Sequence, residues 1–201
     1  MSARRIGVLG GTFDPVHIGH LFVAEALRVE TRLERVLFLP TADPPHRTAH
    51  APVESRRAMV ERAIATNPAF ELDTTALEQA GPAYTADTLD LLREKYSGDA
   101  LCFIAGADSL VRSRWRFLDR VAASLERFYV VARRDSTFDQ VKALLADLPD
   151  SLQQRFEYLA LPYIDVSATE LRARVAAGRA IRYLVPEAVN EYIERRGLYR
   201  D

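Results

Sequence analysis

Residues 6–27 read IGVLGGTFDPVHIGHLFVAEAL, and this stretch decides the fold. Its first four residues are all apolar except for one glycine, which is typical of a strand that is covered on both faces. Two glycines then begin a short polar turn, and apolar residues return at helical spacing from Leu21 to Val29. The stretch therefore predicts a strand, a tight turn and a helix, the first unit of a parallel α/β sheet.

The same alternation recurs along the chain. The later apolar runs are 36–39, 70–73, 101–104, 128–131 and 156–161, and further helical segments are expected at 54–65, 86–96 and 138–145. Strand and helix in turn favour parallel strands joined by right-handed crossovers. We predict an α/β fold with a Rossmann-like, open, mostly parallel sheet and helices on both faces.

The C-terminal part has a different character. Residues 167–177 and 186–196 read as helices, and Gly178 and Gly197 follow their last residues. We therefore expect a small helical portion at about 165–201. The chain has 201 residues and shows neither a linker nor a repeat, so we expect a single domain over 1–201.

Composition excludes several function classes. The chain has 27 Lys and Arg against 28 Asp and Glu, a net charge of −1, so no overall field attracts nucleic acid or an acidic membrane. Cys102, the single cysteine, lies in an apolar run and predicts a buried thiol without a disulfide. No run of 18 apolar residues occurs. These features predict a cytoplasmic protein without a nucleic-acid or membrane partner, and they leave protein partners unknown.

Four segments follow the carboxyl ends of predicted strands: 10–20, 41–52, 105–116 and 132–136. In an open parallel sheet, ligands bind beyond these ends. We therefore expect the four segments to converge on one site.

The turn at the first strand has the features of an anion site. Gly10 and Gly11 lack a Cβ, so backbone N–H groups can approach a ligand oxygen. A helix that begins near Val16 or His17 adds unpaired N–H groups and a partial positive charge. The turn matches neither the P-loop nor the dinucleotide fingerprint. The second strand ends in Pro40, Thr41 and Ala42 rather than in an acidic residue, which argues against hydride transfer.

His17 and His20 lie three residues apart, on one face of the first helical turn. Imidazoles there can stabilise charge on phosphate oxygens, and Gly19 leaves room for a flat ligand. The alternative is that one histidine caps the helix and the other packs. A zinc site formed by Asp14, the two histidines and the loop that holds His46 and His50 is a rival interpretation.

A second phosphate-binding element is suggested by residues 164–172, IDVSATELR. Ser167 and Glu170 fit a capping box, which by itself is only a well-capped helix. Thr169 and Arg172 are three apart, so the same helix start presents a hydroxyl and a guanidinium on one side. It could hold the far end of a polyphosphate.

HIGH at 17–20 with the distant S-x-T-x-x-R resembles the HxGH nucleotidyltransferase superfamily. PPHR at 44–47, AYTADTL at 83–89, FIAGADSL at 103–110 with Trp115, and VVAR at 130–133 are together similar to the bacterial nicotinate-nucleotide adenylyltransferase family. The resemblance extends over essentially the whole chain.

The resemblance implies transfer of AMP from ATP to nicotinate mononucleotide with Mg²⁺, giving deamido-NAD and pyrophosphate. It implies no metal held by protein ligands of its own, and His17, His20 and Arg172 as the catalytic residues. The implied ATP-binding residues are Gly10, Gly11, Thr12, Phe13, Gly106, Asp108, Ser167 and Thr169, and the implied acceptor-binding residues are Tyr84, Thr85, Trp115, His46, Arg47 and Arg133.

The residues agree with this chemistry. The 5′-phosphate of the acceptor is already ionised, so in-line attack on the α-phosphorus needs no protein nucleophile or base, only positioning and charge stabilisation. A helix that starts at Thr85 would present N–H groups to the nicotinate carboxylate, and Trp115 would offer a flat surface or pack in the core. Asp108 would contact the ribose, or cap a helix that runs through Trp115.

Two segments depart from the family pattern. The usual DISST is DVSAT at 165–169, which lacks one serine hydroxyl, and Arg134 and Asp135 replace the usual Pro and Gly. Other acceptors, such as nicotinamide mononucleotide or phosphopantetheine, and an ATP-binding module without catalysis remain alternatives.

Overall fold

The computed structural model describes residues 3–42, 49–79, 84–112, 115–132, 138–162 and 164–200. Within these residues six strands form one sheet in the order β3-β2-β1-β4-β5-β6, and every neighbouring pair is parallel. The strands are β1 (Arg5–Gly11), β2 (Arg35–Pro40), β3 (Phe70–Leu72), β4 (Ala100–Gly106), β5 (Arg127–Val131) and β6 (Phe156–Leu159). The predicted fold class is confirmed.

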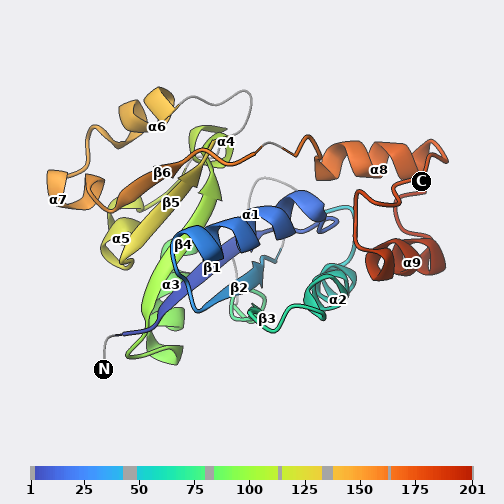
Figure 1. Ribbon diagram of the computed structural model, residues 1–201, viewed down its shortest axis with the longest axis horizontal. Coiled ribbons are helices and arrows are strands. Elements are labelled where there is room, and N and C mark those ends of the chain that lie inside the picture. Colours follow the sequence, from blue (N-terminus) through green and yellow to red (C-terminus); the bar gives the residue numbers. More distant parts are fainter. Residues whose placement is uncertain are drawn as a thin grey trace.

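Helices cover both faces of the sheet (Figure 1). Their bounds are α1 (Ile18–Glu30), α2 (Val53–Ile64), α3 (Thr85–Lys95), α4 (Ala107–Arg112), α5 (Leu118–Ala123), α6 (Phe138–Leu145), α7 (Asp150–Gln153), α8 (Ala168–Ala176) and α9 (Glu187–Arg196).

Successive residues of each strand serve opposite faces, as the pleat requires. In β2, Val36 and Phe38 join a buried cluster with α1, α2, α8 and α9. Leu37 and Leu39 join a second cluster with α3, α4, α5 and α6. Both faces of the central strands are therefore buried, which is why these strands read as continuous apolar runs.

The three central strands are held in a fixed register. Leu9 of β1 lies opposite Phe38 of β2 on one side and Ile104 of β4 on the other. This alignment brings the carboxyl ends of β1, β2 and β4 to the same edge of the sheet.

Most elements agree with the sequence-based prediction, and α4, α5 and α7 are the exceptions. The helix expected to run through Trp115 ends at Arg112. Phe117 takes a left-handed backbone conformation (φ 58°), which a right-handed helix does not allow. The expected helix is therefore wrong, and the chain bends before α5 begins.

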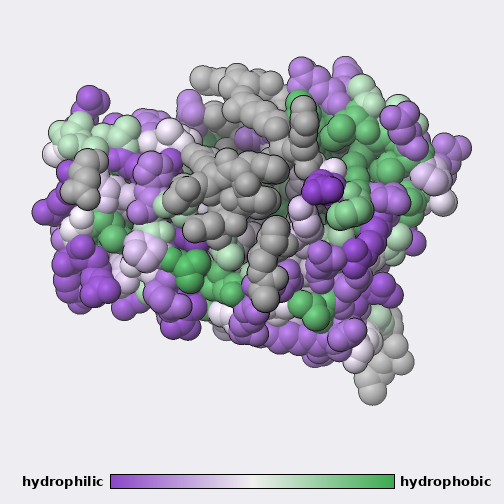
Figure 2. Space-filling view, turned by 180° about the vertical axis from the view of Figure 1, so that it is seen from behind, coloured by the Kyte–Doolittle hydropathy of each residue, from purple (hydrophilic) through white to green (hydrophobic). Residues whose placement is uncertain are grey.

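The surface mixes polar and apolar residues. Figure 2 shows hydrophilic residues over much of one face, with apolar residues gathered at the upper right, the side on which α6 lies. Leu144 of α6 is among the exposed large apolar residues. No helix of the described ranges has both the length and the apolar character needed to cross a membrane.

Candidate active site at the carboxyl edge of the sheet

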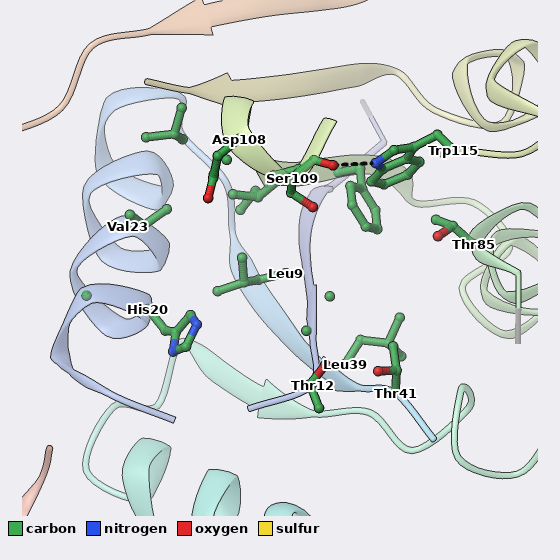
Figure 3. A pocket seen from close by; sticks show the side chains of 18 of the residues that line it. Leu9, Thr12, His20, Val23, Leu39, Thr41, Thr85, Asp108, Ser109 and Trp115 are labelled. Atoms are coloured by element: carbon green, nitrogen blue, oxygen red, sulfur yellow. Dashed lines mark hydrogen bonds between the residues drawn. The ribbon is translucent and has the colours of Figure 1, made fainter. Parts of the chain in front are cut away.

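A pocket of about 450 Å³ opens at the carboxyl ends of β1 and β4 (Figure 3). The chain builds the sheet outward from β1 to β3 and then returns to β4, so the pocket lies at the topological switch point where α/β sheets bind ligands. The described parts of all four segments expected to converge contribute to its wall, as does the chain after β6. Its lining includes residues 9–12, 19–20, 41–42, 84–85, 103–106, 108–109, 115–116, 131–132 and 161–162.

The turn after β1 is packed by its own aromatic side chain. Phe13 is 2% exposed, and its ring meets the edge of the His20 ring at 5.1 Å between centroids. A Cβ on Gly11 would lie 3.2 Å from the Phe13 ring. Gly11 thus gives space to Phe13 as well as lining the pocket with Thr12 and Gly10.

The start of α1 differs from the expectation of unpaired N–H groups. His17 is the N-cap residue, and its N–H donates to Nδ1 of His20 at 3.2 Å. The N–H of Ile18 donates to the carbonyl of Leu184 at 3.1 Å. Two of the N–H groups expected to meet an anion are therefore used inside the protein, one by His20 and one by the loop before α9.

The two histidines are stacked but occupy different places. Their ring centroids are 3.7 Å apart with 25° between the planes. His17 is 2% exposed, whereas His20 lines the pocket, and its ring is visible there in Figure 3. Because Nδ1 of His20 accepts a hydrogen bond, the neutral ring carries its proton on Nε2.

Gly19 leaves space for the His17 ring. A Cβ at this position would lie 3.1 Å from Cε1 and Nδ1 of His17, which is a tight approach. Gly19 also lines the pocket. The glycine thus accommodates the histidine pair, and the room that we expected it to leave for a ligand stays a prediction.

Asp14 joins the turn to three other parts of the chain. Its carboxylate accepts hydrogen bonds from the N–H groups of His50 (2.7 Å) and Ala51 (3.1 Å) and from the Tyr199 hydroxyl (2.7 Å). Its carbonyl accepts from Arg172 Nη1 at 2.7 Å. Burial raises the pKa of Tyr199, and the negative charge of Asp14 adds to the rise. Asp14 thus acts as an organising residue of the turn.

Arg56 of α2 is a site-building residue that sequence analysis missed. Its side chain is fully buried, and Nη1 donates to the carbonyls of Thr12 (2.9 Å) and Thr41 (2.6 Å), while Nε donates to that of Ala51 (3.3 Å). It therefore joins the carboxyl ends of β1 and β2 to the start of α2. The signal was available: Arg56 lies three and four residues before the buried Met59 and Val60, a charge on the apolar face of a helix.

The second predicted phosphate element lies beside the turn, and its first part, Ile164 and Val166, lines the pocket. Ser167, Thr169 and Arg172 are not among the lining residues. Ser167 caps α8, since its side chain accepts from the Glu170 N–H at 3.2 Å. Arg172 is 9% exposed and also donates to Thr169 Oγ1 at 3.3 Å. Arg172 therefore connects α8 to the turn after β1 through Asp14, and the phosphate contacts of these residues stay a prediction.

On the opposite wall of the pocket lie Thr85 and Trp115 (Figure 3). α3 begins at Thr85, as expected, and the side chain of its N-cap residue, Tyr84, makes no capping hydrogen bond. The Trp115 indole donates to the carbonyl of Ser109 at 3.2 Å, and its ring packs against Phe103 at 5.7 Å between centroids. Trp115 is thus both a packed aromatic residue and a part of the pocket wall.

Gly106 ends β4, and Asp108 follows in the first turn of α4, where both line the pocket. Asp108 is therefore inside its helix and not the cap before it. His46, Arg47 and Arg133 lie outside the described residues. Among the residues that are described, no three His, Cys, Asp or Glu side chains are grouped as a metal site, and His46 of the zinc alternative lies outside them.

The cytidylyltransferase-like family profile matches residues 8–174. The chain belongs to this family. The match runs from β1 to α8 and so includes the turn after β1, the pocket and the helix start at Ser167.

Within this cytidylyltransferase-like family, the chain is similar over its full length to proteins named "Probable nicotinate-nucleotide adenylyltransferase". One from Roseiflexus sp. strain RS-1 is 44% identical, with 100% of each chain covered. One from Thermomicrobium roseum is 42% identical over 98% of this chain and 92% of its own length. These full-length relatives agree with the family that the motifs indicated.

A solved structure has the same fold. The nicotinic acid mononucleotide adenylyltransferase of Plasmodium falciparum, complexed with NaAD, superposes with a TM-score of 0.78 over 98% of this chain and 97% of its own. The two sequences are only 16% identical, so this likeness concerns the fold.

Proposed function

We propose that this chain transfers AMP from ATP to nicotinate mononucleotide, producing deamido-NAD and pyrophosphate for NAD biosynthesis. The observation that carries the proposal is the 44% identity over full length with a relative of that name. The pocket supports it, because His20 lines one side, with His17 stacked behind it, and the start of α3 with an indole lines the other.

On the ATP side, we propose that His20 donates from Nε2 to the phosphates, and that His17 holds the His20 ring by stacking. Gly10, Gly11 and Thr12 border the same part of the pocket. Phe13 supports the His20 ring from its edge. Gly106 and Asp108 contact the adenosine in this proposal, and Ser167, Thr169 and Arg172 hold the far phosphates.

On the acceptor side, we propose that the pyridine ring lies between Thr85 and Trp115. The N–H groups at the start of α3 carry partial positive charge, which favours a carboxylate substituent on the ring. Tyr84 lines the same wall. His46, Arg47 and Arg133 stay predicted partners of the acceptor phosphate.

The chemistry is a direct displacement. An oxygen of the acceptor 5′-phosphate attacks the α-phosphorus of ATP, the bond from that phosphorus to the bridging oxygen breaks, and pyrophosphate leaves with the electron pair. No protein nucleophile is needed, and Cys102 is unsuited to be one, since it is buried and burial raises the pKa of its thiol. The chain positions the two phosphates and stabilises their charge.

Mg²⁺ fits this site as a companion of ATP. Mg²⁺ in such sites is held by substrate phosphates and one or two carboxylates and keeps several waters. The pocket lining includes the carboxylate of Asp108, which is the residue that would hold Mg²⁺ together with the ATP phosphates. When bound, Mg²⁺ neutralises charge on the triphosphate.

The test is to identify the products formed from ATP, Mg²⁺ and nicotinate mononucleotide. The proposal predicts pyrophosphate and deamido-NAD in equal amounts, and no pyrophosphate when the acceptor is omitted. With phosphopantetheine as acceptor we expect no product. ATP binding without pyrophosphate release for any acceptor would instead identify a binding module.

Two broader expectations also remain our proposals. Residues 1–201 form a single nucleotidyltransferase domain, with residues from about 165 as its helical portion. The protein works in the cytoplasm on small-molecule substrates.

A further inference from the structure

One arginine on the pocket wall is held in place by aromatic rings. Arg116 follows Trp115 and lines the pocket. Its guanidinium carbon lies 5.1 Å from the centroid of the Tyr84 ring and 5.6 Å from that of Phe117. Its Nη1 also donates to the Tyr84 hydroxyl at 2.9 Å. These contacts hold the guanidinium beside the start of α3, because Tyr84 is the N-cap residue of that helix.

The charge of Arg116 is not balanced by a neighbouring carboxylate in the described part of the chain. Its neighbour Arg120 shows the contrast, since it pairs with both Asp87 and Asp90 of α3. An arginine side chain stays protonated at any pH at which the protein is folded. The wall beside Thr85 therefore carries a positive charge that a bound anion can neutralise.

The acid and amide acceptors differ at one group only. Nicotinate mononucleotide and nicotinamide mononucleotide share the ribose, the phosphate and the pyridine ring, and they differ in a carboxylate against a carboxamide. A guanidinium has only donors and matches both oxygens of a carboxylate. A carboxamide offers one acceptor oxygen and no charge, and its NH₂ group finds no acceptor on an arginine.

We propose that Arg116 is a specificity-determining residue, whose guanidinium binds the carboxylate on the pyridine ring and favours the acid acceptor over the amide. This inference rests on the proposed function. The Arg116 guanidinium adds a full positive charge to the partial positive charge at the start of α3. The Tyr84 and Phe117 rings hold this guanidinium in place before the acceptor binds.

The test compares kcat/KM for the two acceptors in the wild type and in Arg116→Met, which keeps an aliphatic side chain and removes the charge. We expect kcat/KM with the acid to fall by about tenfold or more and that with the amide by less than about twofold, so that the acid-to-amide ratio falls. KM for ATP should not change. Arg93→Met, on the exposed face of the same helix α3, is the matched control and should leave the ratio unchanged.

Two outcomes would overturn the proposal. An equal fall for both acceptors would mean that Arg116 serves the shared part of the acceptor or supports Tyr84. An unchanged kcat/KM for both acceptors would mean that Arg116 serves neither. If Arg116→Met does not fold, Tyr84→Phe carries the test, since it removes the hydroxyl that holds Nη1, and the ratio should again fall. Failure of the proposed function itself is seen separately, as a wild type that does not use the acid at all.

Discussion

His17 and His20 have different tasks although the motif presents them as a pair. His20 faces the pocket, and His17 lies behind it at the helix cap, stacked on the His20 ring. Gly19 permits the stack because it leaves space for the His17 ring. At this scale the structure separates a residue that faces the pocket from one that packs behind it.

Replacing either histidine with alanine should lower kcat by about 10² or more and leave the fold intact, by analogy with a lost oxyanion donor. In His20→Ala, kcat should fall because the Nε2 donor is lost. In His17→Ala, kcat should fall because the ring that supports the His20 ring is lost. Steady-state kinetics checks this, with circular dichroism as the measure of folding. His50→Ala is the control, because that side chain is exposed and only its backbone N–H contacts Asp14. Near-normal kcat in His20→Ala would refute the role.

Tyr199 should make the protein less stable at alkaline pH. Its folded-state pKa is raised above the ordinary value of 10.0 by burial and by Asp14. The folded state thus retains a proton that the unfolded state has lost, so the stabilisation is complete below about pH 10 and declines above it, by about 1.4 kcal/mol per pH unit. Urea unfolding at several pH values should show a smaller decline in Tyr199→Phe than in the wild type.

The same variant gives a second readout at neutral pH. Tyr199→Phe loses a hydrogen bond to a buried carboxylate, which should cost about 1.5 kcal/mol of unfolding free energy. An unchanged free energy at pH 7, together with an unchanged alkaline slope, would show that the contact with Asp14 contributes nothing.

Single residues were predicted unevenly from the sequence. The family motifs placed His20, Thr85 and Trp115 at the pocket, because each of these residues lies beside a turn or helix start that can be read from the local sequence. It missed the connection of Arg56 to Thr41 and that of Tyr199 to Asp14. Those contacts join residues 15 and 185 positions apart, and no local pattern carries such information.

At the scale of elements, a buried cation organises the edge of the sheet. Arg56 of α2 donates to carbonyls that follow β1 and β2 and to one that precedes α2 itself. The other connections are made by α8 through Arg172 and by the chain end through Tyr199. The C-terminal helices are therefore structural supports of the turn after β1.

Arg56→Ala should lower the free energy of unfolding by about 3 kcal/mol or more, because it leaves three carbonyls without this donor and creates a cavity. Chemical denaturation measures the change. Arg57→Ala is the matched control, since that neighbour makes only exposed pairs with Glu54 and Glu61 and should change stability by no more than about 1 kcal/mol. If both variants lost a similar amount of unfolding free energy, the buried hydrogen bonds of Arg56 would contribute no more stability than the exposed pairs of Arg57.

The hydrophobic pattern of the sequence predicted the longer strands and helices, because both faces of the sheet are buried. The strands and the helices α1, α2, α3, α6, α8 and α9 agree with their predicted segments to within a few residues. The short helices α5 and α7 were not predicted, and α4 is shorter than the helix expected to run through Trp115. None of the three has more than six residues, less than two turns, so hydrophobic periodicity cannot show in them.

At the scale of the whole molecule, the strand order places the pocket. The reversal between β1 and β4 leaves room at their carboxyl ends, and the segments that line it come from between Leu9 and Val166. Parallel strands align these ends, so the sequence could predict the convergence. The preference for one acceptor over another depends on side chains such as Arg116, which the fold does not determine.

The central claim is transfer of AMP to the acid mononucleotide. The most direct measurement is pyrophosphate release from ATP and Mg²⁺ with nicotinate mononucleotide and with nicotinamide mononucleotide, assayed side by side on the same preparation. We expect fast release with the acid and slow release with the amide. Equal or faster release with the amide, or no release with the acid while ATP still binds, would contradict it.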